Sequence, residues 1–200
     1  MNRMSCAILA IAVVGLAGCG KADDRHAADN AVIPPGEHTT NMTGAPLNDS
    51  AAHNRATAVL RKADGTSAGT ATATSTPTGD ALLIAINAEG LTSGERGVHV
   101  HMIGSCQGPD FTSAGEHWNP TGAQHGLKNP QGQHAGDMPN LVVGEDGLAT
   151  LEYTLKGGTM VGLLDADGSA LVIHEGPDDQ TTDPAGASGS RIVCGVFEAA

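Results

Sequence analysis

Seven residues of types that bind transition metals fall between positions 99 and 174 of this 200-residue chain. Imidazoles combined with one carboxylate suit zinc, copper or iron, whereas calcium and magnesium prefer oxygen ligands. Seven ligands are too many for one tetrahedral ion, so the set predicts two ions that share a ligand. The shared ligand must be an imidazole that has lost both ring protons, because only then can each nitrogen bind a metal. The seven residues are His99, His101, His117, His125, His134, Asp137 and His174.

Strands and a long loop are expected to position these side chains. His99 and His101 are two apart in an alternating segment, so both project from one face of a strand, about 7 Å apart along the chain. The ligands from His117 to Asp137 follow in a stretch rich in Gly, Pro and Asn. Such a loop can bring side chains of different sequence separation to a common point. His174 closes a later strand.

The remaining sequence predicts a β-fold around this cluster. Aromatic residues make up only 2% of the chain and 28 residues are glycine, so Val, Ile, Leu and Ala must fill the core between glycine-rich turns. Alternation of strand period is clearest at 70–74, 82–86 and 98–101, and later apolar segments lie at 141–143, 148–155, 170–173 and 192–197. Turns are expected at Asp64-Gly65, Thr78-Gly79, Glu89-Gly90 and Asp146-Gly147.

These segments predict an all-β domain of about eight strands without a helix. The expected architecture is a Greek-key β-barrel or sandwich, immunoglobulin-like, with two long functional loops at 104–139 and 175–190. Loops of this length inside a compact domain are usually functional, and the candidate ligands lie in them or at their edges. We expect the domain to cover residues 54–200.

The N-terminus has the features of an export signal. Arg3 is followed by an apolar run from 7 to 17 that is too short for a confident membrane span, and small residues precede Cys19. The segment from Leu16 to Cys19 resembles the bacterial lipobox, although a plain secretory signal with a chance cysteine is the alternative. We therefore expect residues 1–18 to be a signal peptide and Cys19 to carry a lipid anchor, the only membrane contact.

This signal implies an exported protein of the bacterial cell envelope or periplasm, anchored to a membrane. The outer membrane is favoured, because Gly20 stands where an Asp is associated with inner-membrane retention. Residues 19–53 have no sustained apolar period and are expected to form a flexible tether. Its histidines, His26, His38 and His53, could collect copper, but the composition favours a solvated linker with incidental histidines.

Charge and cysteine content narrow the function further. Removal of residues 1–18 takes away one charged residue, Arg3, so the formal net charge of −12 becomes −13. Such an acidic protein is not expected to bind nucleic acid or to dock on anionic lipid by charge. Cys106 and Cys194 are the two cysteines of the expected domain, and a pair in an exported protein predicts a disulfide.

Six segments resemble the copper/zinc superoxide dismutase family, in particular its bacterial exported branch. They follow the family order and span most of residues 55–198. A single His-x-His pair is a weak signal, but the ordered set is specific. The segments are GVHVH at 97–101, SAGEHWNP at 113–120, HGLKNP at 125–130, HAGD at 134–137, VIH at 172–174 and GSRIVCG at 189–195.

The resemblance implies a role for each ligand. One copper ion would bind His99, His101, His117 and His174, and one zinc ion would bind His117, His125, His134 and Asp137, with His117 as the bridge. Cys106 and Cys194 match the family disulfide. Arg191 matches the arginine that guides the anion beside copper, and His117 would also handle a proton, so these two are the expected catalytic residues.

The implied activity is dismutation of superoxide to dioxygen and hydrogen peroxide, which protects the cell envelope. Three departures from the family pattern bear on it. The segment 177–183 lacks the lysine that relatives usually carry, which leaves Lys128 as the nearest basic candidate. Glu116 precedes the bridge where relatives have Gly or Pro, and Trp118 replaces Phe or Tyr. We expect a slower and less salt-sensitive enzyme than the family norm.

Two alternatives remain open at this point. The first is a non-catalytic dismutase-like protein that binds or delivers copper or zinc, but relatives of that kind typically lack a copper ligand or the arginine. The second is another β-fold with a His-x-His pair, such as a cupin enzyme, against which the HAGD segment and the cysteine pair argue. The sequence also leaves open whether the chain forms a homodimer.

Overall fold

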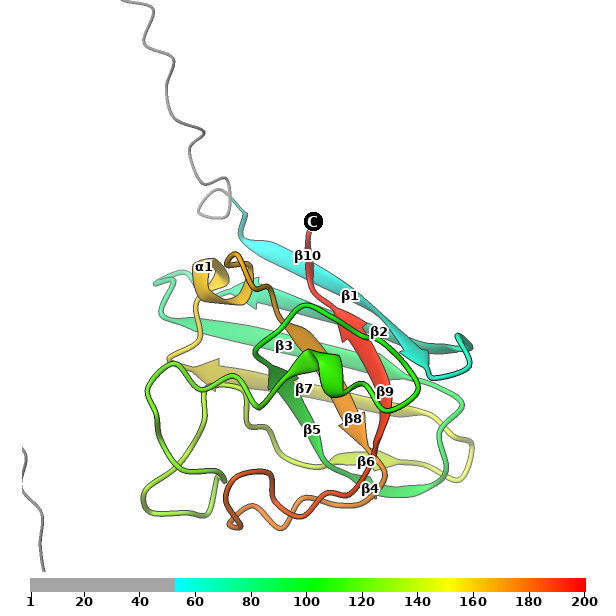
Figure 1. The fold of residues 1–200 in the computed structure, drawn as a ribbon. Helices are drawn as coiled ribbons and strands as arrows, with labels where there is room; N and C mark the ends of the chain where they lie inside the picture. The colour runs from blue at the N-terminus through cyan, green and yellow to red at the C-terminus, as the bar shows by residue number, and fades with distance from the viewer. Residues whose placement is uncertain (1–52) are drawn as a thin grey trace, which may run out of the picture. The chain divides into compact units, whose positions relative to one another are not determined.

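Residues 53–200 are described in the structure of this chain, which is a computed structural model. The expected signal peptide, Cys19, His26 and His38 lie outside the described residues. Ten strands and one turn of α-helix follow one another in the order drawn in Figure 1. They are β1 (Arg55–Lys62), β2 (Ser67–Ser75), β3 (Ala81–Ala88), β4 (Gly94–Arg96), β5 (Val98–His101), β6 (Leu141–Val143), β7 (Ala149–Lys156), α1 (Met160–Leu163), β8 (Ala170–His174), β9 (Arg191–Val196) and β10 (Glu198–Ala199).

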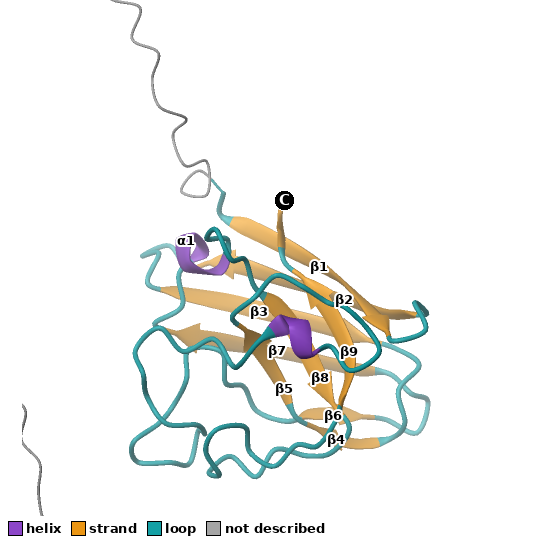
Figure 2. Cartoon of the chain, in the orientation of Figure 1, coloured by secondary structure: helices purple, strands orange, loops and turns teal. Residues whose placement is uncertain are grey.

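The predicted all-β fold is confirmed. Eight strands form one curled antiparallel sheet in the order β5-β8-β9-β1-β2-β3-β7, with β10 paired to β1. A second sheet consists of β4 and β6, and Figure 2 shows how little of the described part is helical. The predicted absence of helix is wrong at α1, where the Thr159 hydroxyl accepts a hydrogen bond from Gly162 N and caps a single turn. It is also wrong at Thr112–Ala114, which form a short 3-10 helix.

Alternating side chains fill the inside of the sheet, as the strand period requires. On β1 the residues Ala56, Ala58 and Leu60 are buried, and on β3 so are Leu82, Ile84 and Ile86. The four predicted turns each place glycine at positive φ, at positions 65, 79, 90 and 147. Among residues 53–200, no helix is long and apolar enough to span a membrane.

The edge strand β5 has a free side that the long loop covers. Val100 N donates to Gly136 O (3.0 Å), and Trp118 N donates to Val100 O (2.8 Å), so the loop passes β5 twice. Isolated bridges pair His101 with His117 and His99 with Asp137. A side chain at Gly136 would place its Cβ 2.3 Å from Val100 O, so this close passage requires glycine.

Candidate metal centre

His99, His101, His117 and His174 form the first of two groups of buried ligands. Two of these residues lie on β5, His174 ends β8, and the bridge to His101 brings His117 alongside. One ring nitrogen from each lies within 4.8 Å of those from the other three. All four side chains are buried, so contacts within the protein fix their positions.

Each of these four imidazoles presents a nitrogen that has no hydrogen-bond partner among the described residues. The nitrogens are Nδ1 of His99 and Nε2 of His101, His117 and His174. The opposite nitrogens are occupied: His101 Nδ1 donates to Gly115 O (2.9 Å) and His174 Nδ1 donates to Gly189 O (3.2 Å). Because a carbonyl can only accept, the ring proton is held there and the lone pair is left on the unpartnered nitrogen. This arrangement suits one ion.

The second group comprises His117, His125, His134 and Asp137. Asp137 Oδ1 lies 3.0 Å from the Nδ1 atoms of His117 and of His125 and 3.2 Å from Nδ1 of His134. The Nδ1 atoms of His117 and His134 are 3.5 Å apart. Ligands about 2.0–2.1 Å from a tetrahedral zinc ion are roughly 3.3 Å from one another. The donor set and its spacing therefore fit zinc.

Only His117 belongs to both groups, through different nitrogens. Its Nδ1 faces Asp137, whereas its Nε2 is the unpartnered atom of the first group. Its ring stacks on that of His99 with 3.9 Å between centroids. The shared imidazole expected from the ligand count thus has the geometry of a bridge.

Asp178 is a further buried residue of the centre that sequence reasoning did not single out. Its Oδ2 lies 2.7 Å from Nε2 of His99, and its Oδ1 lies 3.0 Å from Nε2 of His125, so one carboxylate holds a ligand from each group. The side-chain amide of Asn140 exchanges two hydrogen bonds with the backbone of Asp178. Nothing in the sequence distinguishes Asp178 from the exposed Asp179 next to it, which caps the following turn.

The two groups differ in charge before any ion binds. Burial lowers the pKa of His99 to about 3, of His101 to about 2 and of His174 to about 4, so these imidazoles are neutral near pH 7. Burial also opposes the charged form of His125, but hydrogen bonds to Asp137 and Asp178 outweigh it and raise the pKa of His125 to about 9. Hydrogen bonds from His117 and His125 outweigh burial and hold the pKa of Asp137 well below its ordinary value.

Arg191 lies beside the first group and is held by the disulfide-linked loop. On the sheet, Arg191 pairs with His174. Its guanidinium donates to Phe111 O and to Gly115 O, both at 2.8 Å, and Gly115 O also accepts from His101. Cys106 and Cys194 form a disulfide, as predicted, which ties this loop to β9. Arg191 also lines a depression of about 430 Å³ whose wall includes Thr112 and Ser190.

Two carboxylates act on this arginine. Glu116 and Asp110 are exposed and act on Arg191 through their charge. Lys128, the nearest basic candidate in the sequence, is exposed in the loop of the second group, where its backbone N donates to Gln180 O. Trp118 is buried against the glycines around α1 and belongs to the main core, as expected for a packing residue.

Comparison with known proteins agrees with this geometry. The family model described as copper/zinc superoxide dismutase (SODC) matches residues 67–197. A Cu-Zn superoxide dismutase of Caulobacter vibrioides is 44% identical over 150 residues, which cover 72% of this chain and 85% of that protein. A superoxide dismutase-like protein of Bacillus subtilis is 48% identical over 124 residues, covering 59% of this chain and 63% of that protein.

Solved structures share the fold. A superoxide dismutase-like protein from Bacillus subtilis aligns with a TM-score of 0.63 and 43% identity, over 70% of this chain and 96% of that chain. The Cu/Zn superoxide dismutase from Brucella abortus aligns with a TM-score of 0.60 and 30% identity, over 72% of this chain and 99% of that chain. With ligand geometry, family model and relatives in agreement, the chain belongs to the copper/zinc superoxide dismutase family.

Proposed function

We propose that this chain dismutates superoxide to dioxygen and hydrogen peroxide with one copper and one zinc ion. Copper would bind His99, His101, His117 and His174, and zinc would bind His117, His125, His134 and Asp137. The observation that carries the proposal is the convergence of four buried imidazole nitrogens without partners on one point, beside a pinned arginine. Bound copper would supply one-electron chemistry, oxidising one superoxide and reducing the next.

The residues of the chain orient the substrate and move the proton. Arg191 keeps its positive charge at any physiological pH, and two carbonyls hold it so that a free N–H edge can bind a small anion. His117 Nδ1 is directed at Asp137, which leaves Nε2 as the position at which this ring takes up and releases a proton. Two superoxide anions and two protons give one dioxygen and one hydrogen peroxide.

The copper assignment is tested by loading the protein with copper and zinc and measuring superoxide removal by the wild type and by His174→Ala. We expect the variant to lose nearly all activity, because a copper ligand is missing. Equal activity in the two proteins would contradict the proposal. The alternative, a protein that only binds or delivers metal, predicts no removal by the wild type, and the presence of Arg191 with every ligand argues against it.

We further propose that residues 1–18 are a signal peptide, that Cys19 carries a lipid anchor, and that residues 19–53 are a tether for the domain at 54–200. The supporting observations are the short apolar run before Cys19 and the disulfide, which is favoured in oxidising compartments. Cys19→Ser should release the protein from the membrane fraction of a bacterial host. A variant that stays with the membranes would contradict lipid anchoring.

A further inference from the structure

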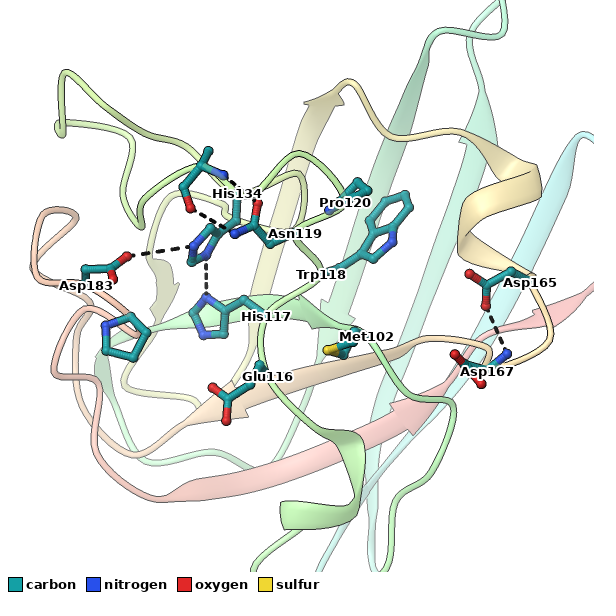
Figure 3. A pocket seen from close by; sticks show the side chains of 12 residues that line it. Met102, Glu116, His117, Trp118, Asn119, Pro120, His134, Asp165, Asp167 and Asp183 are labelled. Atoms are coloured by element: carbon teal, nitrogen blue, oxygen red, sulfur yellow. Dashed lines mark hydrogen bonds and ion pairs between the residues drawn. The ribbon is translucent and has the colours of Figure 1, made fainter. Parts of the chain in front are cut away.

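A third carboxylate, that of Asp183, reaches the second group of ligands from the 175–190 loop. This group, proposed to bind zinc, comprises His117, His125, His134 and Asp137. Its Oδ1 accepts a hydrogen bond from the backbone N of His125 (2.7 Å) and lies 3.9 Å from Nε2 of His134. The second distance is that of an ion pair rather than of a hydrogen bond. One oxygen of Asp183 therefore approaches two residues of the candidate zinc site, and Figure 3 shows this carboxylate directed at the His134 ring.

His134 is the ligand that this carboxylate can orient. Its side chain is almost fully buried, and its Nδ1 faces Asp137 and His117. A metal-binding imidazole usually donates its other N–H to a carboxylate or a carbonyl, which fixes the tautomer and raises the basicity of the ligating nitrogen. For His125 that partner is Asp178. For His134 the carboxylate that faces Nε2 is that of Asp183, at the longer, ion-pair distance of 3.9 Å.

The local fold keeps Asp183 in this position. The side chain of Asp179 accepts hydrogen bonds from the backbone N of Thr181 and of Thr182, and Gly186 N donates to Thr182 O. These bonds hold the turn that immediately precedes Asp183. The carboxylate is about half exposed, at 51%, at the wall of a pocket of about 410 Å³ that also includes His134, Glu116 and Asp167. A change of charge there can be made without cutting into the core.

We propose that Asp183 is a positioning residue for zinc: its negative charge holds the Nε2 proton of His134 and leaves Nδ1 as the metal-binding nitrogen. The 175–190 loop would then support both imidazoles of the zinc site that do not bridge the two ions. Asp178 would support His125, and Asp183 would support His134. This inference rests on the zinc ligands proposed above. It assigns Asp183 no contact with the ion or with superoxide.

The test compares variants that separate charge from tethering. Asp183→Asn keeps an oxygen that can accept from His125 N but removes the charge, whereas Asp183→Ala removes both. Asp167→Asn is the matched control, because Asp167 is exposed on the same pocket and its side chain touches no candidate ligand in the described structure. Zinc affinity of the metal-free full chain is measured by competition with a chelator, and the visible spectrum is recorded after cobalt(II) is bound in place of zinc.

We expect Asp183→Asn to weaken zinc binding about tenfold, at the lower end of the range for such partners, and to shift the cobalt(II) bands. Asp167→Asn should match the wild type in both measurements. If Asp183→Asn also matches the wild type while Asp183→Ala binds weakly, the residue is only a tether and the inference is wrong.

A fourth variant distinguishes failure of this inference from failure of the zinc assignment. Asp137→Ala removes a proposed ligand and should weaken zinc far more than either Asp183 variant. If Asp137→Ala binds zinc as tightly as the wild type, the ligand set itself is wrong and the inference falls with it. If Asp137→Ala loses zinc but Asp183→Asn and Asp183→Ala do not, only the role of Asp183 is refuted.

Discussion

The two halves of the metal centre are built from different kinds of structure. The ligands proposed for copper, His99, His101, His117 and His174, are called copper-type below, and those proposed for zinc are called zinc-type. Three of the four copper-type ligands lie on β5 and β8, which pair with each other in the large sheet. The zinc-type ligands from His117 to Asp137 all come from the loop that follows β5. The copper-type half is therefore positioned by backbone pairing, whereas the zinc-type half depends on how a loop folds over an edge strand.

The halves also differ in how their charges are balanced. The copper-type imidazoles are neutral and their inward nitrogens have no partner within the described residues. The zinc-type half contains the carboxylate of Asp137, and the carboxylates of Asp178 and Asp183 contact its imidazoles. Before any ion binds, the protonated His125 supplies positive charge beside these carboxylates. From this difference we infer that the copper-type half can bind a redox ion without rearrangement, while the ion of the zinc-type half stabilises the loop.

Removal of a copper-type ligand should have the largest effect on activity and little on zinc. We expect His101→Ala, loaded with both metals, to lose at least about a hundredfold in superoxide removal, since loss of an outer partner alone costs about 10- to 100-fold. Its zinc content should equal that of the wild type, because His101 belongs to the copper-type group and not to the zinc-type group. Loss of both metals from His101→Ala would show that the halves are not separable.

Removal of a zinc-type ligand should instead loosen the loop. Asp137 accepts hydrogen bonds from Gly126 N and His134 N in addition to facing three imidazoles. Asp137→Ala should lower zinc affinity by about a hundredfold or more and reduce the melting temperature of the zinc-loaded protein, because a bound ion stabilises only the folded state. Metal analysis and thermal unfolding measure both effects. Unchanged zinc content would mean that the ligand is misassigned.

Opposite pKa shifts should give the metal-free protein a stability maximum near pH 6.5. His99, His101 and His174 have folded pKa values below the ordinary 6.5, so the unfolded chain binds more protons and the free energy of unfolding falls as pH drops below 6.5. His125 has a raised pKa, so its contribution is complete below 6.5 and is lost as pH rises towards 9.

Burial also lowers the pKa of His117, so four groups act on the acid side against one on the alkaline side. Each group changes the free energy of unfolding by at most about 1.4 kcal/mol per pH unit. Denaturant unfolding of the metal-free protein, with a chelator present, at about pH 5, 6.5 and 8 measures how the free energy of unfolding depends on pH. We expect the steeper loss at acid pH. A protein that gains stability from pH 6.5 to 5 would contradict the assignment of neutral, buried imidazoles to the copper-type half.

The smallest predicted effect concerns the charge beside Arg191. Glu116 and Asp110 weaken the attraction of this arginine for an anion, so the rate constant for superoxide should depend only weakly on added salt. Glu116→Gln should raise it by about two- to threefold at low salt, and Glu152→Gln, exposed on β7, should leave it unchanged. A wild-type rate that falls steeply with salt would show that steering is strong despite these carboxylates.

Local patterns were enough to predict much of this molecule. Strand alternation placed His99 and His101 together, and the glycine turns were predicted at the correct positions, because both signals depend on neighbouring residues. The one-turn α1 was missed because four residues carry too little periodicity. The short β4 and β10, of three and two residues, were missed for the same reason.

Long-range contacts were the part that local patterns could not supply. The passage of the 117–136 segment along β5 depends on backbone bonds to Val100 that no local pattern encodes. The same holds for Asp178 and Asp183, which reach His125 across 53 and 58 residues of chain. In sequence these aspartates look like solvated loop charges, and only folding brings the two loops into contact.

The division of the centre into a redox copper-type half and a structural zinc-type half is tested most directly by measuring superoxide removal with each metal alone. Metal-free protein is loaded with copper only, with zinc only or with both, and the rate is measured at equal protein concentration. We predict that the zinc-only protein does not exceed the buffer rate and that both copper-containing forms do. Removal of superoxide by the zinc-only form, or no removal by the doubly loaded form, would contradict the account.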